Sequence, residues 1–223
     1  MESNAALAPA DMTLDELRDA LAPLLGGHAA FDGWSERALE MAATELGVPP
    51  ERARIAFPQG AVEMIDAWFD WVDRSMLIAF PPERVAGLKV RDRIGELILY
   101  RLQLLRPQRE ALRRALATLA MPQNALAAGR LAWRSADRIW RLAGDTATDY
   151  NHYTKRAILI GVYGSTTFIF LDDESEDMTA TRAFLGRRIG DVMQFEKAKA
   201  RLVGRADRRL SLSRFLGRLR YPN

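Results

Sequence analysis

The chain has 223 residues, of which 48% are hydrophobic and 27% are charged, a balance typical of a folded protein. It contains no cysteine and only two histidines, which excludes disulfides and thiolate metal sites and argues against a histidine-based catalytic or metal cluster. The longest apolar stretch, residues 157–171, is interrupted by glycine, serine and threonine. A membrane-spanning helix needs about 20 apolar residues, so we expect this segment to be a buried helix of a soluble protein.

The net charge of +3 hides a strong asymmetry along the chain. Residues 1–60 carry ten acidic residues and four arginines, whereas residues 61–179 carry 16 charges of each sign. Residues 180–223 carry twelve basic residues and three acidic ones. The positive potential is therefore concentrated at the C-terminal end.

The first predicted helix begins after Thr13 and contains leucines at helical spacing. Thr13 and Glu16 have the spacing of a capping box, in which each side chain bonds the backbone of the other. We expect Gly26–Gly27 to end this helix, because glycine is typical of helix C-termini.

Two shorter helices are predicted next. Ser35 is the expected N-cap of the second helix, and Gly47 closes it in the left-handed conformation. The third helix begins after Pro49–Pro50 and is broken by residues 58–60.

The later helices are predicted from apolar periodicity and from the prolines and glycines between them. Their predicted ranges are 61–79, 81–105, 107–120, 122–142, 150–171 and 179–203, followed by an amphipathic segment over 207–220. We find no strand-like alternation bounded by turns, so the predicted fold class is all-α.

No constellation of residues predicts an enzyme. Paired carboxylates, phosphate-binding loops and nucleophile–base spacings are absent from the sequence, and His152 has no nucleophile near it. The acidic run 172–177 lacks the alternating ligands and glycine of a calcium loop, so we interpret it as a solvated loop between helices. We predict no catalytic residue, no metal site and no cofactor.

The N-terminal part of the chain resembles the TetR family. The resemblance rests on Gly33–Trp34–Ser35, on the helix 37–46, on the turn 47–49 and on Phe57. It implies a TetR-like fold, with a helix-turn-helix-like head in residues 1–60, a helical body in residues 61–203 and a tail in residues 204–223. In that family the head binds DNA, and the body binds a ligand and forms a dimer.

The head departs from that pattern at two positions. Glu51 stands where a small residue is usual, and Arg54 replaces an aromatic residue. DNA affinity depends on basic groups that contact phosphates, and this head is acidic. We therefore interpret it as a vestigial, structural head, although Arg52 and Arg54 could still contact phosphates.

A second resemblance is carried by the segment between Trp140 and Arg156. It is similar to the signature of the coenzyme Q (ubiquinone) biosynthesis accessory family, the ninth named protein of that pathway. The matching positions are Trp140, Ala143, Gly144, Asp145, Thr148, Asp149, Tyr150, Asn151, Tyr153, Thr154, Lys155 and Arg156. The resemblance implies a non-enzymatic protein that binds isoprenoid, quinone or phospholipid chains and hands a quinone intermediate to the di-iron hydroxylase of the pathway.

The resemblance implies that body helices line an apolar lipid channel, because burial of chain surface drives binding. The candidate lipid-binding residues are Met64, Trp68, Trp71, Leu102, Leu105, Trp133, Trp140, Gly161, Gly164 and Phe168. Periodicity alone favours an ordinary core at these positions.

The family's hydroxylase-binding surface corresponds here to Asp137, Ile139, His152 and Tyr153. His152 departs from the family, in which tryptophan, a stronger interface anchor, is usual. Asp145, Asp149 and Asn151 have an alternative interpretation as a helix-end network that holds the turn presenting Tyr153.

The tail combines arginines with an apolar stripe at helical spacing, as in helices that lie on membrane surfaces. The candidate membrane-binding residues are Arg205, Arg208, Arg209, Leu212, Arg214, Phe215, Leu216, Arg218, Leu219 and Arg220. The alternative is that this stripe packs on its own domain or on a partner chain.

The sequence thus favours a lipid-binding accessory protein of ubiquinone biosynthesis, working as a homodimer. A TetR-type transcriptional regulator with a hydrophobic ligand is the alternative. The N-terminus shows no secretory or mitochondrial targeting pattern and arginine greatly exceeds lysine, so we expect a bacterial cytoplasmic protein, peripheral on the inner membrane.

Overall fold

The computed structural model describes residues 9, 11–146 and 150–207, with side chains described in these ranges except at residues 150, 151 and 195–207. Within this part of the chain the elements are all helices, which confirms the all-α prediction. The α-helices are α1 (Leu14–Asp32), α2 (Glu36–Leu46), α3 (Pro50–Ala56), α4 (Ala61–Ala79), α5 (Pro82–Ala86), α6 (Val90–Leu105), α7 (Arg109–Leu119), α8 (Ala125–Leu142), α9 (Tyr150–Leu171) and α10 (Thr179–Asp207). Short 3₁₀ turns at Arg106–Gln108 and Pro122–Asn124 precede α7 and α8.

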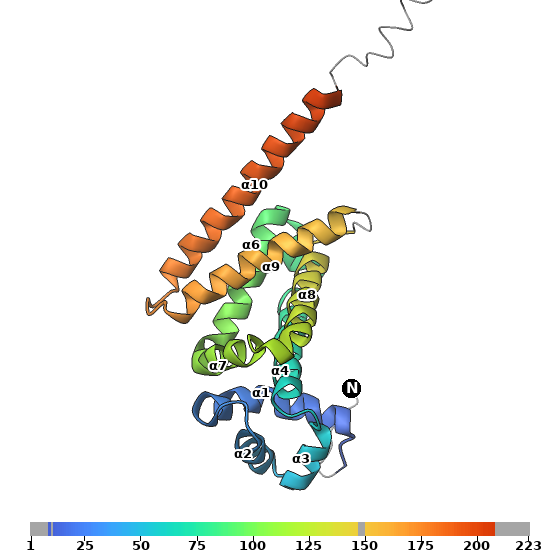
Figure 1. Cartoon of the computed structure of the whole chain (residues 1–223), viewed down its shortest axis with the longest axis vertical. Coiled ribbons are helices and arrows are strands. Elements are labelled where there is room, and N and C mark those ends of the chain that lie inside the picture. Colours follow the sequence, from blue (N-terminus) through green and yellow to red (C-terminus); the bar gives the residue numbers. More distant parts are fainter. Residues whose placement is uncertain (1–8, 10, 147–149, 208–223) are drawn as a thin grey trace, which may run out of the picture.

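Helices α1, α2 and α3 form the head at one end of the molecule (Figure 1). The predicted capping box is present, with Thr13 and Glu16 each bonding the backbone of the other. The predicted ends of α2 are also confirmed, because the Ser35 hydroxyl accepts from the Ala38 amide and Gly47 has a φ of 79°.

The predicted end of α1 at Gly26–Gly27 is wrong. The helix continues to Asp32, and Gly33, with a φ of 70°, follows its last residue. A Cβ on Gly26 would lie 2.0 Å from Gln108 Oε1 and 2.6 Å from Trp68 Nε1, so Gly26 serves close helix packing rather than termination.

The single helix predicted over residues 81–105 is also wrong, because residues 87–89 separate α5 from α6. Gly87 has a low helix propensity, and Lys89 adopts the extended backbone of a new N-cap. Arg93 stabilises the break, since its guanidinium donates to the carbonyls of Ala86 at 3.1 Å and Leu88 at 2.8 Å.

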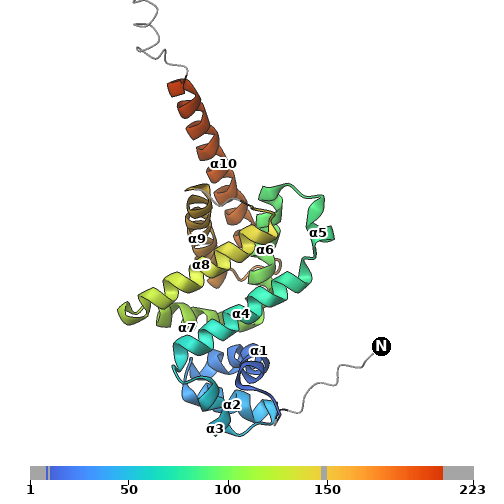
Figure 2. The same ribbon diagram turned by 90° about the vertical axis from the view of Figure 1, so that its right-hand side faces the viewer.

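The body is built around α4, which extends from the head into it, with α5 at its edge (Figure 2). Helix α1 contacts α4 and α7, so head and body share one continuous hydrophobic core. Helix α9 packs on α8 and on α10, and α10 extends beyond the other helices (Figure 1). These contacts place the α8–α9 turn and the first half of α10 around the start of α6.

The acidic run between α9 and α10 has one buried member. Asp173 accepts hydrogen bonds from the backbone and hydroxyl groups of Ser175 and Thr181, whereas Asp172, Glu174, Glu176 and Asp177 are exposed. Burial raises the pKa of the Asp173 carboxyl, but these hydrogen bonds outweigh burial and hold it well below its usual range. No group of three potential metal ligands occurs among the described residues. Through its hydrogen bonds to Ser175 and Thr181, Asp173 anchors the start of α10.

Candidate functional site

The residues that carry the coenzyme Q resemblance form a charged network between α8 and α9. Asp145, in the turn between them, accepts from Lys155 Nζ at 2.6 Å and from Arg156 Nη1 at 3.2 Å. Arg156 also donates from Nε to Asp137 at 2.7 Å, and its side chain is almost fully buried. A buried ion pair of this kind tolerates the loss of neither partner, so the network fixes the angle between the two helices.

The same turn is joined to α6 through Arg93. Its Nη1 donates to the Ala143 carbonyl at 3.1 Å. Gly144 has a φ of 91°, and a Cβ on it would lie 3.0 Å from the same nitrogen. Glycine thus provides both the left-handed backbone and the space that Arg93 needs.

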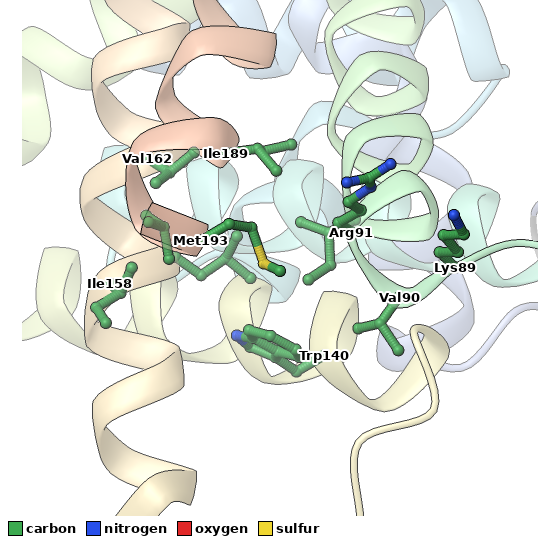
Figure 3. A pocket seen from close by; sticks show the side chains of 11 residues that line it. Lys89, Val90, Arg91, Trp140, Ile158, Val162, Ile189 and Met193 are labelled. Carbon is green, nitrogen blue, oxygen red and sulfur yellow. The ribbon is translucent and has the colours of Figure 1, made fainter. Parts of the chain in front are cut away.

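An apolar cavity of about 300 Å³ lies beside this network, between α6, α8, α9 and α10 (Figure 3). Its lining residues are Lys89, Val90, Arg91, Ile94, Trp140, Ile158, Leu159, Val162, Ile189, Val192 and Met193. We refer to it as the α10 cavity.

Trp140 forms one wall of the α10 cavity (Figure 3). Its indole Nε1 donates to the Lys155 carbonyl at 3.0 Å, and Lys155 Nζ lies 5.4 Å from the ring centroid. Trp140 is thereby oriented by Lys155, through the backbone carbonyl and the ammonium group of that residue. The signature consequently shapes an apolar surface as well as a turn.

Two cationic residues belong to the α10 cavity at the start of α6. Lys89 and Arg91 are both exposed, and Arg91 is paired with Asp92 at 3.2 Å. The cavity therefore combines hydrocarbon walls with positive groups in contact with solvent. Such a site can bury the apolar part of an amphiphile while its polar part stays in water.

The predicted lipid-binding residues are divided among several places in the structure. Trp140 lines the α10 cavity, whereas Gly164 and Phe168 line a second apolar cavity between α7, α8 and α9. The remaining predicted residues line neither cavity: Met64, Trp68, Leu102 and Leu105 are fully buried in the core, Trp71 and Trp133 are half-buried, and Gly161 is exposed.

Most residues of the α10 cavity were not predicted from the sequence. Ile158 and Val162 lie four residues apart on α9, and Ile189 and Met193 do so on α10. Their spacing carried the signal for two facing apolar stripes. The sequence did not indicate that residues of α6 and Trp140 would line the same cavity.

The predicted partner-binding residues lie near one another on α8 and α9. Tyr153 is 62% exposed, and its ring lies 5.9 Å from Trp133 and 5.1 Å from His152 between centroids. Asp137 is half-buried in its ion pairs with Arg156 and Arg141, and Ile139 is fully buried. Tyr153 is the exposed member of this set, and it forms an aromatic cluster with the half-buried rings of His152 and Trp133.

Parts of the prediction fall outside the described residues. Asp149 and the side chain of Asn151 do so, as do the side chain of Arg205 and the whole of residues 208–220, including Arg208, Arg209, Leu212, Arg214, Phe215, Leu216, Arg218, Leu219 and Arg220. Among the helices that are described, none combines the length and apolar character required to cross a membrane.

The arginines of the head are engaged within the protein. Arg54 on α3 is paired with Glu40 and Glu36, and its hydrogen bond to Glu40 raises the pKa of its guanidinium. Arg52 donates to the carbonyls of Pro9 and Met12. The two residues best placed to contact a phosphate are thus held by carboxylates and by backbone.

The fold defines the class of the protein. A solved TetR transcriptional regulator from Nitrosomonas europaea is similar with a TM-score of 0.63 and 28% identity, covering 79% of this chain and 97% of that one. The TetR-like prediction is thereby confirmed.

The family follows from the sequence comparisons. Residues 125–196 match the COQ9 family model. Ubiquinone biosynthesis protein COQ9, mitochondrial, of Rattus norvegicus is 30% identical over 72% of this chain and 54% of that protein, and its Homo sapiens counterpart is 28% identical over 72% and 52%. The probable ubiquinone biosynthesis protein coq9 of Dictyostelium discoideum is 27% identical over 75% and 56%. The chain spans about half the length of these relatives. It carries a COQ9 family region on a TetR-like fold, and the predicted resemblance to the coenzyme Q accessory family is confirmed.

Proposed function

We propose that this protein is a non-enzymatic, lipid-binding accessory protein of ubiquinone biosynthesis. In this proposal it presents a polyprenylated quinone intermediate to the di-iron hydroxylase of the pathway at a membrane surface. The observation that carries the proposal is the α10 cavity, whose wall contains Trp140 of the family signature. The matched relatives are ubiquinone biosynthesis proteins, which supports assigning the cavity to that pathway.

The cavity is suited to hydrocarbon rather than to polar chemistry. Its inner residues are aliphatic side chains and one indole, and that indole nitrogen is already bonded to the Lys155 carbonyl. Each methylene group buried there contributes about 0.8 kcal/mol. A chain segment would therefore bind in the cavity, with the polar end of the molecule near Lys89.

The partner surface in this proposal is the aromatic cluster of Trp133, His152 and Tyr153. Aromatic residues are enriched at protein interfaces, and the two helices that carry this cluster, α8 and α9, are joined by the Asp145–Arg156 and Asp137–Arg156 ion pairs. A homodimer, and residence in a bacterial cytoplasm on the inner membrane, belong to the same proposal.

A TetR-type regulator with a hydrophobic ligand is the second candidate. The similarity to the Nitrosomonas europaea regulator favours it, because that match covers 97% of the regulator's chain. The paired arginines of the head argue against it, since non-specific DNA affinity needs cations free to replace counterions.

The test is to extract and identify the lipid that purifies with the full chain, using native mass spectrometry before and after extraction. We expect an isoprenoid, quinone or phospholipid at fixed stoichiometry. Met193→Glu places a carboxylate on the wall of the α10 cavity and should reduce occupancy at least tenfold, because burial of a charge is costly.

Met121→Glu is the matched control, since Met121 is similarly exposed, 46% against 39%, and does not line the α10 cavity. It should retain the lipid. An empty wild-type protein that retards promoter DNA at physiological salt would contradict the carrier proposal and favour the regulator.

A further inference from the structure

The second apolar cavity, which we call the α7 cavity, differs from the first in its polar lining residues, which carry hydroxyl groups instead of exposed cations. It has a volume of about 290 Å³, lies between α7, α8 and α9, and shares no lining residue with the α10 cavity. Leu116, Leu119 and Phe168 belong to its apolar walls. Three hydroxyl-bearing residues line it as well. Thr167 donates its hydroxyl to the Tyr163 carbonyl at 2.9 Å, and the other two are Ser135 of α8 and Tyr163 of α9.

The hydroxyls of Ser135 and Tyr163 are both bound to one buried guanidinium group. Arg101 has no exposed surface, and it donates from Nε to the Tyr163 hydroxyl at 3.2 Å and from Nη2 to the Ser135 hydroxyl at 3.1 Å. These two nitrogens form one edge of the planar group, so the two hydroxyl oxygens lie side by side. The third nitrogen, Nη1, is paired with Asp73, which is also fully buried.

This arrangement determines which further hydrogen bonds the two hydroxyls can make. Each oxygen accepts a hydrogen bond from Arg101, so each O–H proton remains to be donated. Within the described part of the chain, neither hydroxyl donates to a protein acceptor. Donors without an acceptor at the wall of an apolar cavity are costly unless an acceptor arrives with the ligand.

The charge around the hydroxyls favours a neutral acceptor over an anionic one. Asp73 balances Arg101 and also accepts from Arg138 at 2.9 Å, and Arg138 is further paired with Asp70 at 2.7 Å. An ionised ligand would lose its hydration on entering the cavity, and it would meet only cations that are already paired with carboxylates. A neutral carbonyl oxygen, in contrast, has two lone pairs and can accept from both hydroxyls.

We propose that the α7 cavity is a binding site for a small apolar carbonyl compound, whose oxygen accepts hydrogen bonds from Ser135 and Tyr163. Arg101 acts as a positioning residue, because it orients both hydroxyls and polarises them as donors. The site is independent of the lipid function proposed above, since it uses other residues and another kind of recognition.

The experiment is an NMR titration of the full chain with acetophenone labelled with ¹³C at the carbonyl. We expect saturable binding and a downfield shift of the carbonyl resonance on binding. Cumene is similar in size, with a methyl group in place of the oxygen, and should bind about three- to tenfold more weakly, the effect of one or two neutral hydrogen bonds.

Tyr163→Phe should weaken acetophenone binding by a similar factor, reduce the carbonyl shift and leave cumene binding unchanged. Tyr100→Phe is the matched control, because the Tyr100 hydroxyl donates to the Ser75 carbonyl at 3.2 Å, outside the cavity. Ser135→Ala provides a second test should Tyr163→Phe fail to fold. Ala128→Phe, which fills the cavity, should abolish binding of both probes.

Equal binding of acetophenone and cumene, or an unshifted carbonyl resonance, would overturn the proposal. Met193→Glu should leave acetophenone binding intact, so failure of the lipid proposal and failure of this one are distinguishable. Octanophenone separates two sources of the same chemistry. If octanophenone binds more tightly than acetophenone, the natural ligand is a lipid whose carbonyl carries a chain. If octanophenone binds more weakly, the natural ligand is a free small molecule.

Discussion

The head and the body of this molecule are stabilised in different ways. The head packs its helices closely through small residues, and Ala42, Ala43, Ala53 and Ala56 are all fully buried there. The body places long side chains between its helices, including the buried guanidinium groups of Arg101 and Arg156, and it contains both apolar cavities described above. Helices spaced by large side chains leave room for a ligand, whereas helices in contact through alanine do not.

The largest effect should come from removing a buried charge from the body. Arg101→Met leaves Asp73 buried without its closest partner, so the free energy of unfolding should fall by about 3–5 kcal/mol, measured by urea denaturation. Arg74→Met is the control, because Arg74 pairs with Asp19 and Asp70 at the surface and should contribute no more than about 1 kcal/mol. Equal losses in the two variants would contradict the contrast between body and surface.

An intermediate effect is expected where the head meets the body. Gly26→Ala would press its Cβ against Gln108 and Trp68, so we expect a loss of about 1–3 kcal/mol from overpacking. A Cβ on the neighbouring Gly27 would have no other atom within 4 Å. Gly27→Ala should therefore stabilise the protein by about 0.5–1 kcal/mol through helix propensity. Thermal melts of the two variants should therefore shift in opposite directions.

The smallest effect should arise at the buried carboxylate before α10. The folded-state pKa of Asp173 lies below the value of about 3.9 expected for an unfolded chain. Its contribution is therefore complete above that pH and is lost as the pH falls through the folded-state pKa. The melting temperature of wild type should exceed that of Asp173→Asn at pH 7, by the equivalent of about 1 kcal/mol, and the difference should shrink towards pH 3.

Asp177→Asn, an exposed change in the same loop, is the control for this pH dependence. Its melting temperature should follow that of wild type at every pH. A difference between wild type and Asp173→Asn that stayed constant down to pH 3 would show that the charge of Asp173 makes no contribution.

The helices and their caps could be predicted because they depend on nearby residues. Thr13 with Glu16, and Ser35 with Gly47, are local signals, and all of them are confirmed. The two errors in the predicted helices had different causes. Gly26 has the composition of a helix end but is determined by a contact with Gln108, more than 80 positions away, which no local pattern contains. Gly87, in contrast, is a local signal for the break between α5 and α6, and the apolar periodicity around it obscured that signal.

The candidate site was predictable only in part, for the same reason. The signature from Trp140 to Arg156 led to the family and to one wall of the α10 cavity. The α7 cavity depends on Arg101, whose partners are 28, 34 and 62 positions away along the chain. A buried arginine cannot be distinguished from an exposed one by sequence pattern, so the two hydroxyls it orients carried no signal.

The contact between head and body makes the head a structural requirement of the body. Trp34 of the head packs on Trp68 with 5.1 Å between ring centroids and donates from its indole to the Ala111 carbonyl at 3.0 Å. Loss of the head would expose Trp68 and the adjoining face of α7 to water. The stability of the body is therefore sufficient to retain a head of this shape, even though Arg52 and Arg54 are engaged by backbone carbonyls and by carboxylates within the head.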